Sequence, residues 1–321
     1  MAERCPTRVE EENVLIQAGD CSISVLPHLG GKIASIRLKN RELLQAPIAP
    51  LARRNHTMPF DESDASGWDE CLPSVAKCTV ETPSGIAHVP DHGDLWRVHW
   101  QPVGSNNHNH SVQLQAQCFS LPLTLRRTLD LSSDVSGSHI ELKYKLTNNG
   151  RSSTPWSWAA HPLFAVEAGD RIVLPDTIHS LRLEGSGGGR LGAGGNTVTW
   201  PVATLADGSL SDQGVAQPYQ SGIGDKLFAG PLALAENWCA LERPSAGVRL
   251  RFRFDPVALP YLGLWLCYGG WPDRTGPKQM CVALEPATAP VDSLTQCGPW
   301  SRVLAPRESY SWSIILDLEP I

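Results

Sequence analysis

A glutamate and a histidine, each followed directly by proline, are the strongest candidates for chemistry in this chain. Glu285 ends the apolar run 282–284 and precedes Pro286. Because proline cannot donate to a sheet ladder, we expect a buried strand to stop there. A carboxyl group at a strand end, partly desolvated in a cleft, has the raised pKa that suits a general base. The alternative interpretation is a solvated glutamate without a chemical role.

His161 repeats this arrangement. It follows an aromatic stretch that contains Trp156 and Trp158, and Pro162 comes directly after it. We therefore expect His161 to close a strand, as Glu285 does. Two titratable groups placed in this way predict one acid and one base that meet at a cleft. A histidine in apolar sequence is also a common core residue, and that alternative stays open at this point.

A third polar cluster, residues 91–94, holds His92 between aspartates just before Trp96. Its glycine allows a tight turn that presents the histidine beside tryptophan. Carboxylates, imidazole and aromatic faces suit a sugar, whose hydroxyls form hydrogen bonds and whose C–H faces pack on rings. The competing hypothesis is a metal site formed by His88, His92 and Asp94, although no second ligand motif accompanies it.

The composition is typical of a turn-rich protein with a substantial core. The 321 residues include 28 Gly, 26 Pro and 11 Trp, and the formal net charge is -6. No polybasic segment is present, so neither a nucleic-acid nor a membrane partner is expected. The amino-terminal sequence has no apolar signal core, and the longest apolar stretch, residues 257–268, is interrupted by Pro260. We therefore expect a cytoplasmic protein.

The nine cysteines are odd in number and form no Cys-x-x-Cys pair. This pattern favours reduced thiols over a disulfide framework, and it gives no ligand set for structural zinc. Several cysteines lie in apolar sequence and are predicted to be small core residues: Cys71, Cys239, Cys267 and Cys281.

Apolar and polar residues alternate with a period of two in several segments, which is the pattern of antiparallel strands with one buried face. The clearest segments are residues 112–118, 140–146 and 248–254. We predict an all-β protein, a single large antiparallel β-sandwich over residues 1–321, with no long helix. The glycine-rich segment 185–195 lacks the context of a phosphate loop and is predicted to be a surface loop.

The motifs resemble, in their order along nearly the whole chain, a divergent branch of the aldose 1-epimerase (galactose mutarotase-like) superfamily. No single motif is specific, and the colinearity carries the resemblance. The matching segments are residues 29–36 with their Gly-Gly pair, residues 42–44, residues 67–73, His92-Gly93, His161 with Phe164, and Glu285-Pro286.

The resemblance implies a supersandwich fold and the interconversion of α and β anomers of an aldose without metal or cofactor. By this resemblance, Glu285 matches the general base that takes the anomeric proton, and His161 matches the general acid that protonates the ring oxygen. His92 matches a residue that orients the sugar. Asp225, which we expect in a loop, matches an acidic residue that holds a ring hydroxyl.

We also expect Asp69 and Trp96 to bind the substrate. Asp69 and Glu70, with the aspartates of residues 91–94, would repel an anion, which predicts a neutral free aldohexose. The opposite hypothesis is a hexose-6-phosphate mutarotase with a phosphate pocket lined by arginines. Those arginines, interpreted otherwise as a solvated sheet face, are Arg53, Arg54, Arg126, Arg127, Arg249, Arg251 and Arg253.

Two other classes of function stay open. One is a non-catalytic carbohydrate-binding or regulatory protein, which would need neither Glu285 nor His161 as proton-transfer groups. The other is a domain of a polysaccharide lyase or glycoside hydrolase, where a second carboxylate must stand at a fixed distance from Glu285. Asp69, Glu70 and Asp225 are the candidates for that carboxylate. For the oligomeric state we expect a monomer or a homodimer.

Overall fold

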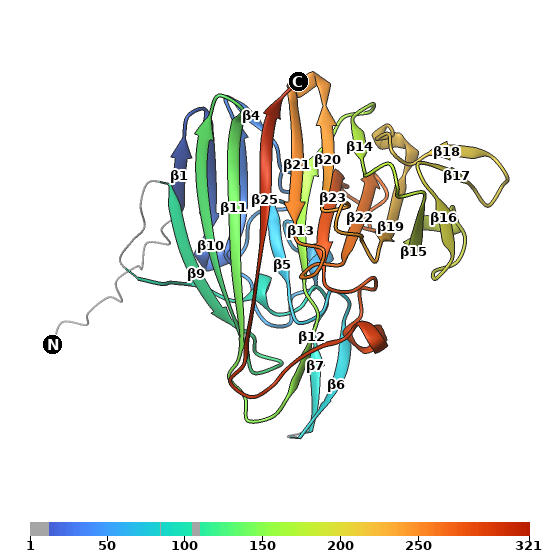
Figure 1. Cartoon of the computed structure of the whole chain (residues 1–321). Coiled ribbons are helices and arrows are strands. Elements are labelled where there is room, and N and C mark those ends of the chain that lie inside the picture. Colours follow the sequence, from blue (N-terminus) through green and yellow to red (C-terminus); the bar gives the residue numbers. More distant parts are fainter. Residues whose placement is uncertain (1–12, 84, 105–109) are drawn as a thin grey trace.

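The computed structural model describes residues 13–83, 85–104 and 110–321, and these residues form β-strands joined by loops and turns without any α-helix (Figure 1). The larger sheet has eleven strands. In spatial order these are β1 (Val14–Ala18), β2 (Cys21–Leu26), β3 (Lys32–Leu38), β5 (Trp68–Cys71), β13 (Ala159–Ala165), β23 (Met280–Ala287), β22 (Tyr261–Tyr268), β19 (Ile223–Ala229), β15 (Ser180–Ser186) and β16 (Thr197–Thr199), with β4 (Arg41–Glu42) paired to β3.

A second, eight-stranded sheet lies in front of the first in Figure 1. Its strands are β14 (Arg171–Val173), β20 (Trp238–Arg243), β21 (Val248–Phe254), β25 (Ser309–Pro320), β11 (Gly137–Asn148), β10 (Leu123–Asp134), β9 (Ser111–Gln117) and β8 (Gln101–Pro102). Three two-stranded ribbons complete the strands: β6 (Cys78–Thr82) with β7 (Gly85–Val89), β12 (Thr154–Trp156) with β24 (Arg302–Leu304), and β17 (Val202–Thr204) with β18 (Leu210–Asp212).

Short 3-10 turns of three residues each are the only helical elements among the described residues. They are η1 (Pro27–Leu29), η2 (Phe60–Glu62), η3 (Leu95–Arg97), η4 (Gly187–Gly189), η5 (Tyr219–Ser221), η6 (Pro244–Ala246), η7 (Leu294–Gln296) and η8 (Gly298–Trp300). None of the described helices is long and apolar enough to cross a membrane.

The two sheets pack face to face around a shared core. Phe252 of β21 lies between two aromatic rings of the larger sheet, with ring centroids 5.7 Å from Trp68 and 5.9 Å from Phe164. The alternation in the sequence predicts this layer correctly, because Ile140, Leu142 and their alternate neighbours on β11 are buried. The all-β sandwich prediction is therefore confirmed.

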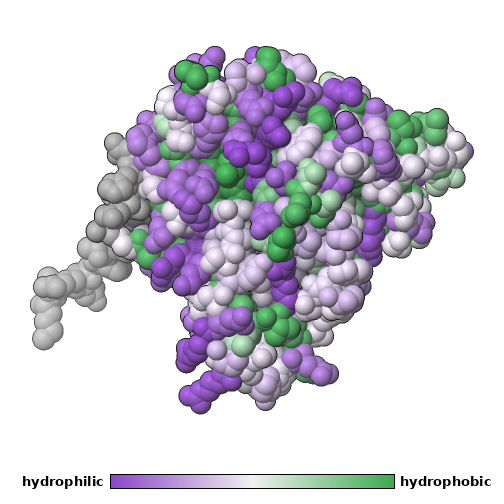
Figure 2. All heavy atoms as spheres, viewed as in Figure 1, coloured by the Kyte–Doolittle hydropathy of each residue, from purple (hydrophilic) through white to green (hydrophobic). Residues whose placement is uncertain are grey.

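The outer face of the eight-stranded sheet carries the polar members of the same alternation. Arg249 and Arg253 of β21 form ion pairs there with Glu242 and Asp317, respectively. Figure 2 shows the face of the molecule over this sheet, on which hydrophobic residues form small separate groups. These arginines lie on a solvated sheet face, as one of the two interpretations of the sequence had it.

Neither of the two prolines beside the candidate catalytic residues ends its strand, which corrects the sequence-based expectation. β23 continues through Pro286, and β13 continues through Pro162. β13 and β23 pair at Ala159–Ala287 and again at Leu163–Ala283, and the described strands make no ladder pair between these two points. Because the ladder is open there, a missing N–H costs no hydrogen bond, and the strands tolerate proline in their interior.

The cysteines and the glycine-rich segment also have defined places. The eight described cysteines are all free, and Cys71, Cys239, Cys267 and Cys281 are buried as predicted. Gly185 belongs to β15, at an irregularity in its pairing with β19, and η4 follows directly. The glycine-rich segment is thus partly strand, and its loop portion is anchored through Arg190, which binds Asp225.

Candidate active site

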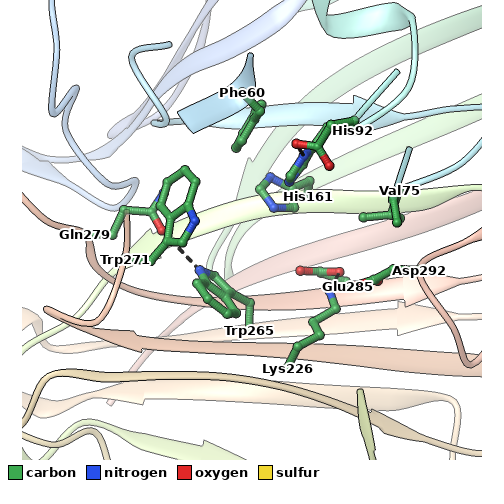
Figure 3. Close-up of a pocket in the computed structure, with 12 residues that line it drawn as sticks. Phe60, Val75, His92, His161, Lys226, Trp265, Trp271, Gln279, Glu285 and Asp292 are labelled. Carbon is green, nitrogen blue, oxygen red and sulfur yellow. Dashed lines mark hydrogen bonds and ion pairs between the residues drawn. The ribbon is translucent and has the colours of Figure 1, made fainter. Parts of the chain in front are cut away.

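The opening between β13 and β23 brings the predicted acid and base together. His161 is two residues from both Ala159 and Leu163, and Glu285 is two residues from both of their partners. The register therefore places His161 directly across from Glu285, with both side chains on one face of the sheet. Figure 3 shows the two side chains pointing toward one another in a cavity. His92 lies beside them.

The cavity has a volume of about 150 Å³ and lies over the face of the larger sheet that is turned away from the shared core. Residues from β13, β19, β22, β23 and the neighbouring loops line it. They are Phe60, Val75, Ala76, Asp91, His92, His161, Lys226, Trp265, Trp271, Gln279, Glu285 and Asp292. This mixture of aromatic walls and a few convergent polar groups is typical of a small-molecule site.

Glu285 is fully buried, and its two carboxylate oxygen atoms have different surroundings. Lys226 of β19 donates from Nζ to Oε2, whereas Oε1 has no hydrogen-bond partner among the described residues. Burial raises the pKa of Glu285, and the ammonium group of Lys226 opposes this increase. Burial alone would lower the pKa of Lys226, but Glu285 and Asp292 raise it above its ordinary value. The site therefore holds a carboxyl group with one free oxygen atom beside a protonated lysine.

Gly263 of β22 makes room for this ion pair. It is the ladder partner of Glu285, and a Cβ atom at position 263 would lie 3.0 Å from Oε2 of Glu285 and 3.1 Å from the ring of Phe228. A glycine inside a strand often marks a close approach of another group. Here the approaching group is the candidate base itself.

His161 is buried, and Nδ1 has no hydrogen-bond partner in the described part of the chain. Burial lowers the pKa of His161 well below its ordinary value, and the nearby charges of His92, Lys226 and Lys32 lower it further. The rings of Phe60 and His92 pack edge-on against it, at centroid distances of 5.5 and 5.1 Å. The imidazole is thus fixed by packing, while a ring nitrogen is left for a ligand.

His92 occupies a tight turn after β7. Its backbone has a φ of +58°, which histidine adopts more readily than most residues, and its Nδ1 lies 2.8 Å from Oδ2 of Asp91. Phe60 stacks on its ring at 3.7 Å. Gly93 follows with a φ of +70°, and a Cβ atom there would lie 2.2 Å from the carbonyl oxygen of Leu72. Glycine is therefore required next to His92.

The opposite wall of the cavity is aromatic. Trp265 of β22 donates from Nε1 to Oε1 of Gln279, and Nε2 of Gln279 donates to the carbonyl oxygen of Ala65. Trp271 lies in the loop between β22 and β23 and packs near Phe60, with ring centroids 6.0 Å apart. These half-buried rings offer flat faces to the C–H groups of a ligand.

Asp225, one of the predicted substrate-binding residues, lies in strand β19 and not in a loop. Its carboxylate is fully buried, accepts a hydrogen bond from Oγ of Ser186 at 2.6 Å, and pairs with the guanidinium group of Arg190. Successive residues of a strand point to opposite faces, so Lys226 faces the cavity and Asp225 faces away. The prediction of a direct sugar contact for Asp225 does not match this position.

Asp69 and Trp96 also lie outside the cavity lining. Asp69 is the ladder partner of His161 on β5, and its carboxylate pairs with Lys32 at 2.7 Å and Arg54 at 3.1 Å. Trp96 is buried behind the wall, edge-on to Phe60, and its Nε1 donates to the carbonyl oxygen of Asp91. The structure thus makes both residues supports for the lining and not part of it.

Two of the arginines and all three of the carboxylates named for the alternative functions are held in buried ion pairs. Arg54 pairs with Asp64 and Asp69, and Arg127 pairs with Glu70. Neither guanidinium group is free for a phosphate. Both are buried, so the interpretation of Arg54 and Arg127 as part of a solvated sheet face is wrong. The carboxylates considered as a second hydrolytic group, Asp69, Glu70 and Asp225, are all held in ion pairs away from Glu285.

The residues of the metal hypothesis are separated in function. Asp94 accepts hydrogen bonds from the backbone N–H groups of Phe119 and Ser120, and His88 is exposed on β7. In the part of the chain that the structure describes, no group of three or more His, Cys, Asp or Glu side chains is arranged to hold a metal ion.

Sequence reasoning missed Lys226, Asp292 and the aromatic residues Phe60, Trp265 and Trp271. The sequence does contain one indication of Lys226. It directly follows Asp225, in a segment that was considered only for its carboxylate, and neighbouring residues of a strand face opposite sides of the sheet. The others lie in loops or in continuous apolar sequence, where only the fold shows which side chains face the cavity.

Comparison with solved structures supports the fold. The chain is similar to the Slr1438 protein of Synechocystis sp. PCC 6803, with a TM-score of 0.71, 14% identity and 100% of both chains covered. It is similar to a galactose mutarotase-like protein of Lactobacillus casei ATCC 334, with a TM-score of 0.64 and 14% identity. That match covers 96% of this chain and 100% of the Lactobacillus casei chain. It is also similar to an Escherichia coli K12 protein with a provisional aldose 1-epimerase name. The TM-score is 0.69, the sequence identity is 17%, and the match covers 97% of this chain and 99% of that one.

No protein-family model matches the chain, and no curated protein sequence matches it. The fold is thus the galactose mutarotase-like β-sandwich that the resemblance implied, at a sequence identity that shows the fold alone.

The turn at His92 predicts a steric penalty for Gly93→Ala. Gly188, with a φ of +62° and open space within 4 Å of the position that a Cβ atom would take, is the matched control. Gly188→Ala should cost about 1–2 kcal/mol of unfolding free energy for its left-handed backbone, and Gly93→Ala about 1–3 kcal/mol more because of the clash. Urea unfolding measures both, and equal losses would contradict the role of Leu72.

Removal of the ammonium group beside Glu285 should raise the pKa of this carboxyl further. In Lys226→Met the opposing positive charge is lost, so the protonated form of Glu285 gains. Carboxyl ¹³C NMR of glutamate-labelled protein follows the titration, with Glu285→Gln to assign the signal. Lys226→Arg keeps the charge and should leave the pKa closer to that of the unchanged protein. A lower pKa in Lys226→Met would refute the pairing.

Proposed function

We propose that this protein is an aldose 1-epimerase that interconverts the α and β anomers of a free aldohexose. The observation that carries the proposal is the pairing of His161 and Glu285 across the open ladder, each with an unpartnered polar atom, counted over the described residues, in one cavity. Neither atom finds a hydrogen bond within the described protein, so a polyhydroxylated ligand would satisfy both.

The proposed reaction begins with the anomeric hydroxyl group near Oε1 of Glu285. Glu285 takes the hydroxyl proton while the bond between C1 and the ring oxygen breaks, and the electron pair of that bond goes to the ring oxygen. His161 supplies a proton to this oxygen, which leaves an open-chain aldehyde. Rotation about the C1–C2 bond and ring closure, with the two roles reversed, give the other anomer.

The surrounding residues assist these steps. Lys226 binds Oε2 of Glu285 and leaves Oε1 as the proton acceptor. Trp265 and Trp271 offer faces for the sugar ring, and His92 is placed to orient its hydroxyl groups. General acid–base assistance contributes on the order of 10²–10⁴-fold, and positioning adds to it. The proposed steps assign no role to a metal ion or a cofactor.

A non-catalytic sugar-binding protein would use the same cavity without proton transfer. The arrangement favours catalysis because burial raises the pKa of Glu285 and lowers that of His161 within one cavity, and strongly shifted pKa values are frequent at functional sites. Exchange between the anomers of a bound sugar separates the two functions.

Glu285→Gln should lower anomer exchange at least about a hundredfold, since the amide cannot accept the proton, and should leave folding and sugar affinity nearly unchanged. Saturation-transfer NMR with glucose and galactose measures exchange, and ligand line broadening measures binding. The exposed Glu81 provides the matched control, Glu81→Gln. Exchange at the normal rate in Glu285→Gln would refute the base assignment.

The opposed pKa shifts predict a narrow pH optimum for kcat/KM. The base must be ionised, so kcat/KM falls as the pH drops through the pKa of Glu285, which burial raises above 4.5. The acid must be protonated, so kcat/KM falls as the pH rises through the pKa of His161, which burial lowers well below 6.5. Both limbs move inward, so the pH range over which kcat/KM is high should be narrower than the ordinary pKa values of the two groups would give. A plateau extending to about pH 8 would instead indicate that neutral His161 donates its N–H proton.

A further inference from the structure

Asp292 lines the cavity, and its backbone is unusually well fixed. Its carbonyl oxygen accepts hydrogen bonds from the N–H groups of Val75 at 3.0 Å and Ala76 at 2.8 Å and from Oγ of Ser74 at 3.2 Å. Its own N–H donates to Oε1 of Glu184 at 3.2 Å. Four hydrogen bonds thus hold the backbone of Asp292 in place. None of them involves its side chain, so the side chain is not needed to maintain the loop.

The carboxylate of Asp292 is free for a ligand. Oδ1 is buried, and no donor in the described ranges lies within hydrogen-bond distance of it. The nearest cation is Nζ of Lys226, at 3.8 Å, and this ammonium group already binds Glu285. Figure 3 shows Asp292 beside Glu285 at the edge of the cavity. A buried acceptor without a donor is costly unless a ligand satisfies it.

The charges of the cavity do not balance. The described lining residues carry three carboxylates, Asp91, Glu285 and Asp292, against the single ammonium group of Lys226. Lys226 binds Glu285 and His92 binds Asp91, so among the three carboxylates only that of Asp292 has a buried oxygen atom, Oδ1, with neither a hydrogen bond from a described residue nor a place on the reacting side of Glu285. Burial raises the pKa of Asp292 and Lys226 lowers it, while Glu184 and Asp91 add to the rise and His92 opposes it.

We propose that Asp292 determines specificity by charge: it accepts a hydrogen bond from a hydroxyl or protonated amino group of the sugar, and it repels aldoses that carry a carboxylate or phosphate. This proposal rests on the proposed sugar site and names its substrate class, neutral aldoses and protonated amino aldoses. The physical reason is that an anionic group in this small cavity would face Asp292 with no free cation to balance it. The sequence-based preference for a neutral sugar relied on Asp69 and Glu70 together with the aspartates of residues 91–94. Of these, Asp69 and Glu70 cannot act in this way because buried cations neutralise them.

The test compares sugar affinities in the unchanged protein, in Asp292→Asn and in Asp176→Asn, where Asp176 is an exposed control outside the cavity lining. Ligand-observed NMR at about pH 7 gives the Kd of glucose, 2-amino-2-deoxyglucose and glucuronate, and anomer exchange is recorded in the same samples. Asp292→Ser is the second variant if Asp292→Asn folds poorly.

We expect the unchanged protein to bind glucuronate at least about tenfold more weakly than the other two sugars. Asp292→Asn should reduce that gap by about tenfold while the affinity for glucose changes less than about threefold, and Asp176→Asn should change neither. Equal binding of glucuronate and glucose by the unchanged protein, or a uniform loss for all three sugars in Asp292→Asn, would overturn the charge role. Failure to bind any sugar would overturn this proposal and the proposed function together, whereas binding without exchange would overturn only the latter.

Discussion

The interrupted hydrogen-bond ladder between β13 and β23 is the constraint on which the site depends. The strands pair above and below the gap, so the register fixes His161 opposite Glu285, and the two prolines fit because no ladder bond is required of them. A rigid sheet holds both groups more precisely than a loop would. The neighbouring strands then add what the gap leaves open: β22 contributes Gly263, which gives Glu285 room, and β19 contributes Lys226.

Buried charges around β5 support the same region from behind. Asp69 and Glu70 are neighbours on this strand. Lys32 of β3 and Arg54, from the loop after β4, neutralise Asp69, and Arg127 of β10 neutralises Glu70. Glu70 also accepts hydrogen bonds from Tyr144 of β11, in the second sheet, and from Trp158, which directly precedes β13. These bonds connect β5 to the second sheet and to the strand that carries His161. Such networks are fully satisfied or very costly. They support the strand beside His161 and contribute a positive charge, that of Lys32, that lowers the pKa of His161.

The sequence predicted the sandwich because half-buried antiparallel strands repeat every two residues, and β9, β11 and β21 show that repeat plainly. It also named Glu285, His161 and His92, which the structure brings together in one cavity. It failed where the answer depends on a neighbouring strand. A proline in the sequence predicts the end of a strand, but β13 and β23 continue through theirs because no ladder hydrogen bond between them is formed at those positions. Asp225 and Lys226 are adjacent, and only the placement of β19 decides that the lysine, not the aspartate, faces the cavity.

A crystal structure of Glu285→Gln with a bound aldose tests the central claim most directly. The account predicts the anomeric hydroxyl group within hydrogen-bond distance of the side chain at position 285, and the ring oxygen within that distance of His161, with the sugar ring against Trp265 or Trp271. A sugar bound with its anomeric carbon remote from both side chains, or in another cavity, would contradict the assignment of His161 and Glu285 as the reacting pair.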